Sequence, residues 1–175
     1  MSDTITLGAL NALPDDEARV VLGRCCGAWA WGKQMASSRP FRDRNQLIAA
    51  AERIWMELPP EVWLEAFHHH PRIGDMASLR ERFASTADLA SREQSSVATA
   101  TTETLEALAE GNRAYEEKFG YIFIVCATGK SADEMLALLR ARLSNDAATE
   151  IRNAAAEQMK ITRLRLERLV PEGNL

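Results

Sequence analysis

The stretch at residues 67–75 reads FHHHPRIGD, and it closes a helical run with three histidines followed by a proline. A proline pushes the residue before it out of the α region, so His70 is predicted at the point where helix gives way to loop. Histidine both gives and takes a proton near neutral pH, because its unperturbed pKa is about 6.5. All three histidines of the chain lie in this stretch. If the protein performs acid–base chemistry through histidine, the site is here.

Two other interpretations of the histidine triplet compete with a catalytic one. Three consecutive histidines can simply be a solvated helix end. A metal site would need converging side chains, but successive helical residues lie about 100° apart, so His68, His69 and His70 point in three directions. Helical metal pairs also use an i, i+4 spacing, which the triplet lacks. We therefore expect no metal ion.

Length and composition predict one globular domain. A chain of 175 residues suits a single domain, residues 1–175, with a good core. Charged residues make up 26% and hydrophobic residues 46%, which are ordinary values for a soluble globular protein. The 21 basic and 25 acidic residues give a net charge of −4. This balance disfavours a nucleic-acid partner, which usually needs a basic patch.

Cysteine usage and the chain start favour a cytoplasmic protein. Cys25 and Cys26 are adjacent and Cys126 is distant, so no Cys-x-x-Cys pair supports a zinc or thioredoxin-type site. Three buried free thiols in a reducing compartment are the simplest account. Residues 1–6 lack the features of a signal peptide, and the longest apolar run, residues 122–127, is too short to span a bilayer. We expect no membrane association.

Apolar residues recur at helical spacing through most of the chain, which predicts an all-α fold. Acidic residues after Pro14 indicate one helix start, and Asp43 is the predicted N-cap of another. Gly120 is the predicted αL cap of a long helix, and Ser131 with Glu134 is a predicted capping box. The predicted helices cover approximately residues 14–28, 43–58, 60–70, 102–119, 132–143 and 147–170.

Residues 121–127 form the one β-like run, rich in Ile, Val and Phe. A single short strand has no partner here, so we predict extended backbone buried inside a single compact multi-helix domain. Backbone N–H and C=O groups in such a segment must be satisfied, and a polar ligand could do so.

Several short motifs follow one another along the chain. They are RPF at residues 39–41, FxxHPxIGD at 67–75, EQ at 93–94, NxxYxxxFG at 112–120 and KIxxLRL at 160–166. Each is weak alone, but their order and distances over nearly the whole chain resemble the OHCU decarboxylase family. OHCU is 2-oxo-4-hydroxy-4-carboxy-5-ureidoimidazoline, an intermediate of urate breakdown.

The resemblance implies a cofactor-free, all-helical homodimer that converts OHCU into (S)-allantoin and carbon dioxide. The family's catalytic histidine precedes the proline, so it falls on His70, while its glutamate falls on Glu93 and its arginine on Arg165. One departure is visible: some members bind ligand through a serine three residues before the glutamate, and that position is Ala90 here. The substrate-binding residues implied by the resemblance are Pro71, Gln94, Phe123, Ile124 and Val125.

This assignment makes chemical sense. A C=N group lies next to the carbon of OHCU that loses the carboxylate, so the substrate is its own electron sink and needs no pyridoxal phosphate or thiamine. His70 would be the acid–base group, Glu93 would polarise it or hold a ureido N–H, and Arg165 would bind an oxygen anion. Taken alone, Glu93 and Arg165 could be surface charges. The alternative function is a non-catalytic helical module that binds a ureide or purine-like ligand.

Overall fold

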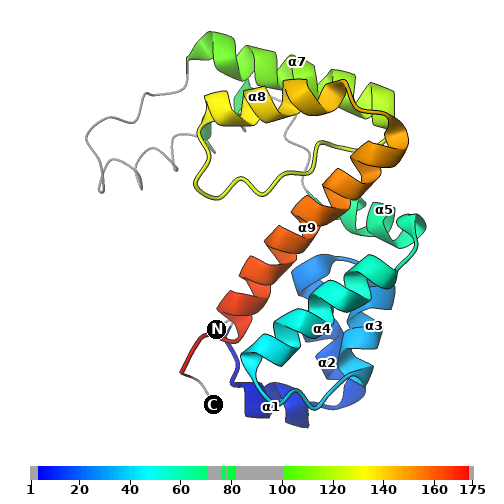
Figure 1. Cartoon of the computed structure of the whole chain (residues 1–175). Coiled ribbons are helices and arrows are strands. Elements are labelled where there is room, and N and C mark those ends of the chain that lie inside the picture. Colours follow the sequence, from blue (N-terminus) through cyan, green and yellow to red (C-terminus); the bar gives the residue numbers. More distant parts are fainter. Residues whose placement is uncertain (1–3, 71–75, 78, 82–100, 174–175) are drawn as a thin grey trace. The chain divides into compact units, whose positions relative to one another are not determined.

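The computed structural model describes residues 4–70, 76–77, 79–81 and 101–173. All regular secondary structure assigned within these ranges is helical, which confirms the all-α prediction (Figure 1). Contacts group the chain into two compact units. Unit 1 comprises Met1–His70 and Ile151–Leu175, and unit 2 comprises Pro71–Glu150. A single domain over residues 1–175 stays a prediction.

Unit 1 is a helical bundle in which α2 packs on α3 and α3 packs on α4 (Figure 1). The final helix α9, Ala147–Leu169, contributes to this unit from Ile151 onward. The other helices of unit 1 are α1 (Leu7–Ala12), α2 (Asp15–Cys26), α3 (Trp29–Ser37), α4 (Arg44–Glu57) and α5 (Pro60–His68).

Local sequence signals account for most of these helix boundaries. The Asp43 side chain accepts from the Gln46 N–H at 2.8 Å, which confirms it as the N-cap of α4. The helix predicted to run to about Ala28 ends at Cys26. Gly27 adopts a φ of 91° and ends α2 as an αL cap, so the chain turns there and α3 starts separately.

Buried tryptophan side chains form part of the core of unit 1 and link its helices. Trp31 and Trp55 are fully buried, and Trp63 is nearly so. The Trp55 Nε1–H donates to the carbonyl oxygen of Ala155 at 2.8 Å, which links α4 to α9. These tryptophans therefore belong to the core, as their helical spacing predicts. Trp29 is different, because 56% of it is exposed.

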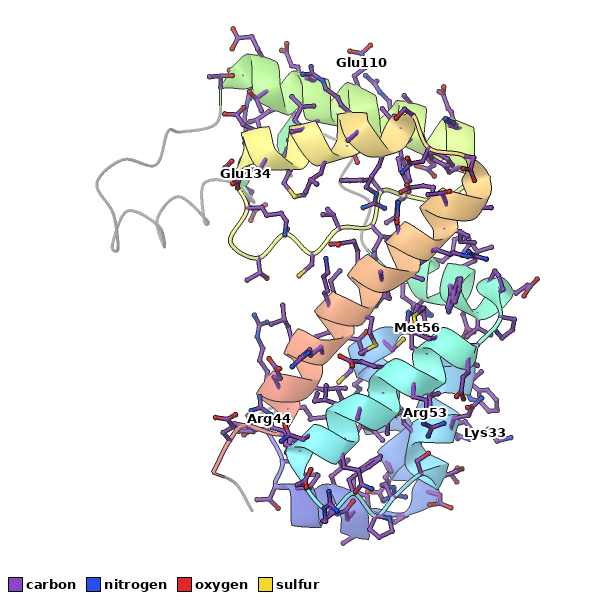
Figure 2. All side chains as sticks on the ribbon, viewed as in Figure 1. Lys33, Arg44, Arg53, Met56, Glu110 and Glu134 are labelled. Carbon is purple, nitrogen blue, oxygen red and sulfur yellow. The ribbon has the colours of Figure 1, made fainter. Side chains whose placement is uncertain are left out.

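The outer face of α4 carries an apolar side chain among charges. Met56 is 56% exposed and follows Arg53 on this face (Figure 2). Arg53 pairs with Glu57 on the same helix at 3.3 Å, a surface ion pair that contributes little to stability.

Unit 2 includes the extended segment and the helices α7 (Thr102–Phe119) and α8 (Ala132–Leu143), which lie side by side (Figure 1). Gly120 caps α7 with a φ of 82°, and Ser131 with Glu134 forms the capping box that starts α8. Residues 122–127 are extended and belong to no strand or helix. These three predictions are confirmed.

Candidate active site

His70 lies immediately beyond α5, where its N–H donates to the Phe67 carbonyl oxygen at 3.2 Å. The helix ends at His68, and His69 is its C-cap, so the predicted boundary is confirmed. The three histidines differ in environment. His68 and His69 are exposed, whereas His70 is half-buried. Only His70 thus has the partly desolvated surroundings that suit an acid–base group.

A buried glutamine on α9 contacts the imidazole ring. Nε2 of His70 lies 2.5 Å from Oε1 of Gln158. Gln158 is completely buried, and its own Nε2 donates to the hydroxyl oxygen of Thr162 at 3.1 Å and to the carbonyl oxygen of Cys26 at 3.4 Å. The amide that meets the histidine is therefore itself held by two partners.

Arg165 lies on the same helix, seven residues after Gln158 and three after Thr162. These spacings place the three side chains on one face of α9. Arg165 is half-buried, and its Nη1 donates to the carbonyl oxygen of Cys25 at 3.3 Å. Among the residues that the structure describes, no carboxylate forms an ion pair with it. A guanidinium has five N–H donors, so others remain for an anion.

The neighbouring arginines of α9 have different surroundings. Arg163 and Arg168 are exposed. Arg163 forms surface pairs with Glu167 at 3.1 Å and with Glu52 at 3.4 Å. Arg165 is therefore not one more member of a solvated basic stripe.

The end of α2 connects the two candidate groups. Carbonyls in the last turn of a helix lack intrahelical partners. Here the consecutive carbonyls of Cys25 and Cys26 accept from Arg165 and Gln158, respectively. The negative end of the α2 dipole also favours the guanidinium. Gly27 makes the close turn possible, since a side chain there would meet Cβ of His69 at 3.0 Å.

The thiols of this turn do not have the character of nucleophiles. All three cysteines of the chain are free and buried. Burial raises the pKa of the Cys25 thiol to about 11, although Arg165 partly opposes the shift. Burial likewise raises the pKa of the Cys26 thiol to about 12. Both remain protonated at neutral pH, so their backbone carbonyls, not their sulfur atoms, contribute to the site.

In unit 2 the extended segment is anchored from α8. Nη1 of Arg142 donates to the carbonyl oxygen of Ile124 at 2.7 Å, and the guanidinium lies 4.6 Å from the centroid of the Phe123 ring. Within the described part of the chain, the N–H groups of Phe123, Ile124 and Val125 donate to no acceptor. Backbone N–H groups that have no acceptor within the protein can donate to a bound ligand.

Arg142 is in turn held by a buried carboxylate. Glu150 is completely buried, and it accepts from Tyr115 Oη at 2.5 Å, Arg142 Nε at 2.6 Å and Asn145 Nδ2 at 2.9 Å. Burial acts to raise the pKa of Glu150, but these hydrogen bonds and the Arg142 charge outweigh it and hold the pKa below its usual value. Burial and the hydrogen bond to Glu150 raise the pKa of Tyr115. Glu150 is thus an anion and Tyr115 a neutral donor.

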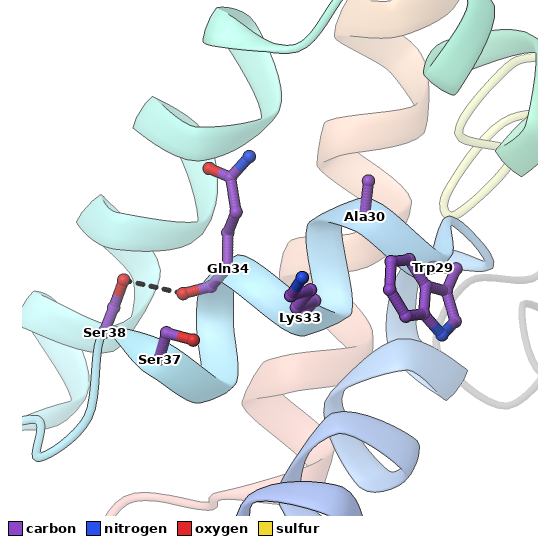
Figure 3. A pocket seen from close by; sticks show the side chains of 6 residues that line it. All are labelled: Trp29, Ala30, Lys33, Gln34, Ser37 and Ser38. Carbon is purple, nitrogen blue, oxygen red and sulfur yellow. Dashed lines mark hydrogen bonds between the residues drawn. The ribbon is translucent and has the colours of Figure 1, made fainter.

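A hollow on the outer face of α3 contains none of the predicted site residues. It lies in unit 1, and it includes an exposed indole and one cation (Figure 3). Lys33 Nζ lies 5.3 Å from the centroid of the Trp29 ring, which accounts for their arrangement on this surface. The lining residues are Trp29, Ala30, Lys33, Gln34, Ser37 and Ser38.

No group of three or more His, Cys, Asp or Glu side chains within the described residues could hold a metal ion. None of the helices that the structure describes combines the length and apolarity needed to cross a membrane.

Comparisons with known proteins place the chain in a family. The model of the OHCU decarboxylase family matches residues 11–167, which include parts of both units. The chain belongs to the OHCU decarboxylase family. The predicted family resemblance is therefore confirmed.

Relatives within the family differ in length. A uric acid degradation bifunctional protein from Arabidopsis thaliana is 38% identical over 89% of this chain and 47% of its own length. This chain thus spans about half of that relative. A 2-oxo-4-hydroxy-4-carboxy-5-ureidoimidazoline decarboxylase from Haloferax volcanii is 31% identical over 93% of this chain and 94% of its own length.

A solved structure agrees with these relatives. The crystal structure of an OHCU decarboxylase in the presence of (S)-allantoin is 36% identical and has a TM-score of 0.69. The match covers 89% of this chain and 97% of that one. The structure of an (S)-allantoin synthase has the same TM-score at 21% identity, and it supports the fold alone.

The predicted site residues of this family member are only partly within the described structure. In unit 1, His70 is linked to the Cys26 carbonyl through Gln158, and Arg165 donates to the adjacent Cys25 carbonyl. Phe123, Ile124 and Val125 form the anchored extended segment of unit 2. Three further predicted residues lie outside the described residues: Pro71, Glu93 and Gln94.

Sequence reasoning missed the residues that hold the candidate groups in place. Gln158 could have been found from the sequence, because its spacing from Thr162 and Arg165 places three polar side chains on one face of a helix. Arg142 and Glu150 offered no comparable signal, since they are eight residues apart and separated by a helix break.

Proposed function

We propose that this chain decarboxylates OHCU to (S)-allantoin. Family membership along nearly the whole chain is the observation that carries the proposal, because the Haloferax volcanii relative is matched over 94% of its length. The candidate site adds chemical support. It pairs a half-buried imidazole with a half-buried guanidinium, an acid–base group and a cation for an oxygen anion.

The proposed reaction requires the protein to orient the substrate and to deliver one proton. When the C–COO⁻ bond breaks, its electron pair moves into the adjacent C=N group of the substrate and leaves an enol-like intermediate. This electron sink belongs to the substrate, so the proposed reaction uses no cofactor and no metal ion. The remaining task is to deliver one proton to one face of a planar carbon.

His70 is proposed as the acid–base group that delivers this proton. An imidazole is suited to the step because its ordinary pKa is near neutrality. Glu93 is proposed to polarise the imidazole or to hold a ureido N–H. As a neighbouring anion it would raise the pKa of His70.

Arg165 is proposed to bind an oxygen anion that grows during bond cleavage. Its planar fork suits a carboxylate or an enolate, and its contact with the Cys25 carbonyl uses one donor. A fixed cation facing developing charge stabilises the transition state more than the ground state.

The ring and ureido groups of the substrate are proposed to bind the backbone of Phe123, Ile124 and Val125. Available N–H donors in this segment support the role. The side chain of Gln94 and the Pro71 position complete the proposed binding set. The substitution of alanine for a serine at position 90 removes a contact that some family members are expected to make.

A cytoplasmic homodimer is proposed as the working form. The reduced state of three buried thiols fits a reducing compartment. In unit 1, Trp31, Trp55 and Trp63 are buried, whereas Trp29 is exposed and offers apolar surface for association. Sedimentation at micromolar protein concentration tests the dimer, and a monomer would contradict it.

The activity is tested directly with OHCU formed freshly from urate. OHCU decays slowly without an enzyme, so its disappearance is followed spectroscopically with and without the purified protein. The proposal predicts a rate that rises in proportion to protein concentration and survives treatment with a chelator. If the protein binds the ureide but leaves the decay rate unchanged, it is a binding module and the proposal is wrong.

A further inference from the structure

We propose that Gln158 is a positioning residue that keeps the proton on Nε2 of His70 and so makes Nδ1 the nitrogen that exchanges a proton with substrate. The proposal rests on the proposed function only for its catalytic consequence. The preference for one tautomer is a property of the protein without substrate.

The orientation of the Gln158 amide follows from its partners. The oxygen and nitrogen of an amide are assigned through the hydrogen-bond network around them. The Cys26 carbonyl oxygen is an acceptor only, so the amide atom that meets it at 3.4 Å must be the NH₂ group. That group also reaches the hydroxyl of Thr162 at 3.1 Å. The amide oxygen is consequently the atom that faces His70.

An amide oxygen can only accept, and this fixes the role of the ring nitrogen. Nε2 of His70 lies 2.5 Å from Oε1 of Gln158, so Nε2 must carry a hydrogen. Flipping the amide would place an NH₂ group against the imidazole and an oxygen against the Cys26 carbonyl. Two acceptors would then face each other at a completely buried side chain, which is unfavourable.

This arrangement suits a catalytic cycle in which the ring changes charge. The imidazolium carries hydrogens on both nitrogens, and the neutral ring keeps the one on Nε2. When Nδ1–H protonates the enol-like carbon, a C–H bond forms, the Nδ1–H bond breaks and the imidazole becomes neutral. The enol O–H proton passes to the substrate nitrogen that took up the electron pair, which leaves a carbonyl group. Gln158 accepts from Nε2–H before and after the step. The ring can thus hold its position without any rearrangement of its support.

The support is rigid because it belongs to the core of unit 1. Gln158 and Thr162 are both at least 99% buried. Their outer partner, the Cys26 carbonyl, closes α2 and lies next to the Cys25 carbonyl that binds Arg165. One helix end therefore holds the imidazole, through Gln158, and the guanidinium of Arg165 in a fixed relation.

Nitrogen-15 NMR of the full chain tests the tautomer without substrate. Replacing His68 and His69 by glutamine leaves His70 as the only histidine. The spectra are recorded above the pH at which the ring is seen to titrate in the same sample, so that the imidazole is neutral and carries a single hydrogen. We expect one protonated nitrogen, Nε2, with a hydrogen that exchanges slowly with water. Gln158→Met in the same background should lose this protection, whereas Gln34→Met, at an exposed position on α3, should retain it.

A second pair of variants keeps the test decisive if Gln158→Met does not fold. Thr162→Ser retains the hydroxyl oxygen that accepts a hydrogen bond from the Gln158 amide, and Thr162→Val removes it. The slow Nε2–H should persist in the serine variant and weaken in the valine variant. A hydrogen on Nδ1 in the parent protein would overturn the proposal. The proposal would also be overturned if the Nε2–H exchanged equally slowly in the parent, Gln158→Met and Thr162→Val.

Kinetics with OHCU then separates this inference from the proposed function. Acid–base catalysis contributes about 10²- to 10⁴-fold to a rate, so a mispositioned acid should lower kcat about tenfold to a hundredfold with KM little changed. Gln34→Met should match the parent. If the parent has no activity, the proposed function is wrong. The NMR measurement still shows which nitrogen of His70 carries the hydrogen. If the parent is active and Gln158→Met raises KM alone, Gln158 has no positioning role.

Discussion

Arg142 Nη1 lies 2.7 Å from the carbonyl oxygen of Ile124, so a charged side chain of α8 holds the middle of the extended segment. The same guanidinium is bound through Nε by the buried carboxylate of Glu150 at 2.6 Å. A backbone stretch with no strand partner thereby acquires a fixed position. The charge pair explains how irregular backbone is tolerated inside a helical unit.

Replacing Arg142 by methionine should therefore destabilise unit 2 and weaken substrate binding. The change leaves the buried anion of Glu150 without its cation, which typically costs about 3–5 kcal/mol. The extended segment also loses its anchor, so we expect KM for OHCU to rise. Urea denaturation and steady-state kinetics measure the two effects.

A matched control for this variant lies on the same helix. Arg140 is exposed, and Arg140→Met removes the same charge without a buried partner. Its free energy of unfolding and its KM should stay close to those of the parent. Equal losses from the two variants would mean that Arg142 has no special anchoring role.

Acid should selectively weaken the Glu150 cluster. The pKa of Glu150 lies below its unfolded value of about 4.3, so its contribution to stability is present above that pH and is lost as the pH falls through the folded pKa. Glu150→Gln lacks this contribution at every pH. The difference in free energy of unfolding between parent and variant should be largest near neutral pH and shrink below a pH of about 4.3. A difference that stays constant through this range would contradict the assignment of Glu150 as the anion.

The geometry of Arg165 predicts a graded response to substitution. Lysine keeps the charge but loses the planar pair of donors, so Arg165→Lys should retain partial activity. Arg165→Met should lose about 2–4 kcal/mol of transition-state stabilisation, with a fall in kcat as well as a rise in KM. Steady-state kinetics on OHCU measures both parameters.

Two exposed neighbours serve as controls for Arg165. Arg163→Met and Arg168→Met remove the same charge from exposed positions on the same helix. Both should cost little in catalysis. Normal turnover by Arg165→Met would assign the anion-binding role to another residue.

Helix ends and the extended segment were predictable because their signals are local. Asp43 caps α4, Gly120 ends α7 and the Ser131–Glu134 box starts α8, each as a few adjacent residues dictate. The short α1 and the separate α3 were missed. The break before α3 depends on one glycine, Gly27, whose positive φ is not evident from a helical pattern.

The supporting residues of the site were harder to predict, because they act across long stretches of sequence. His70 and Gln158 are 88 positions apart, and Arg165 and Cys25 are 140 apart. No local pattern links such pairs. Family motifs identified the groups proposed to touch substrate, whereas the residues that hold them needed the folded chain. Glu93 and Gln94 lie outside the described residues, so their roles stay predictions.

The histidine triplet gives an internal comparison for the acid–base assignment. His70→Ala should abolish turnover, because it removes the half-buried imidazole that precedes the proline. His68→Ala and His69→Ala should keep most of the activity, since both side chains are exposed. Initial rates of OHCU loss measure all three variants, and equal losses would mean that the triplet acts as a unit.

The handedness of the product tests the central claim most directly. Water protonates the planar intermediate from either face, so uncatalysed decay gives racemic allantoin, whereas a fixed acid can protonate only one face. Circular dichroism of allantoin formed from fresh OHCU should show the (S) enantiomer in excess with the parent protein and no excess with His70→Ala. Racemic allantoin from the parent protein, formed at the uncatalysed rate, would contradict the account.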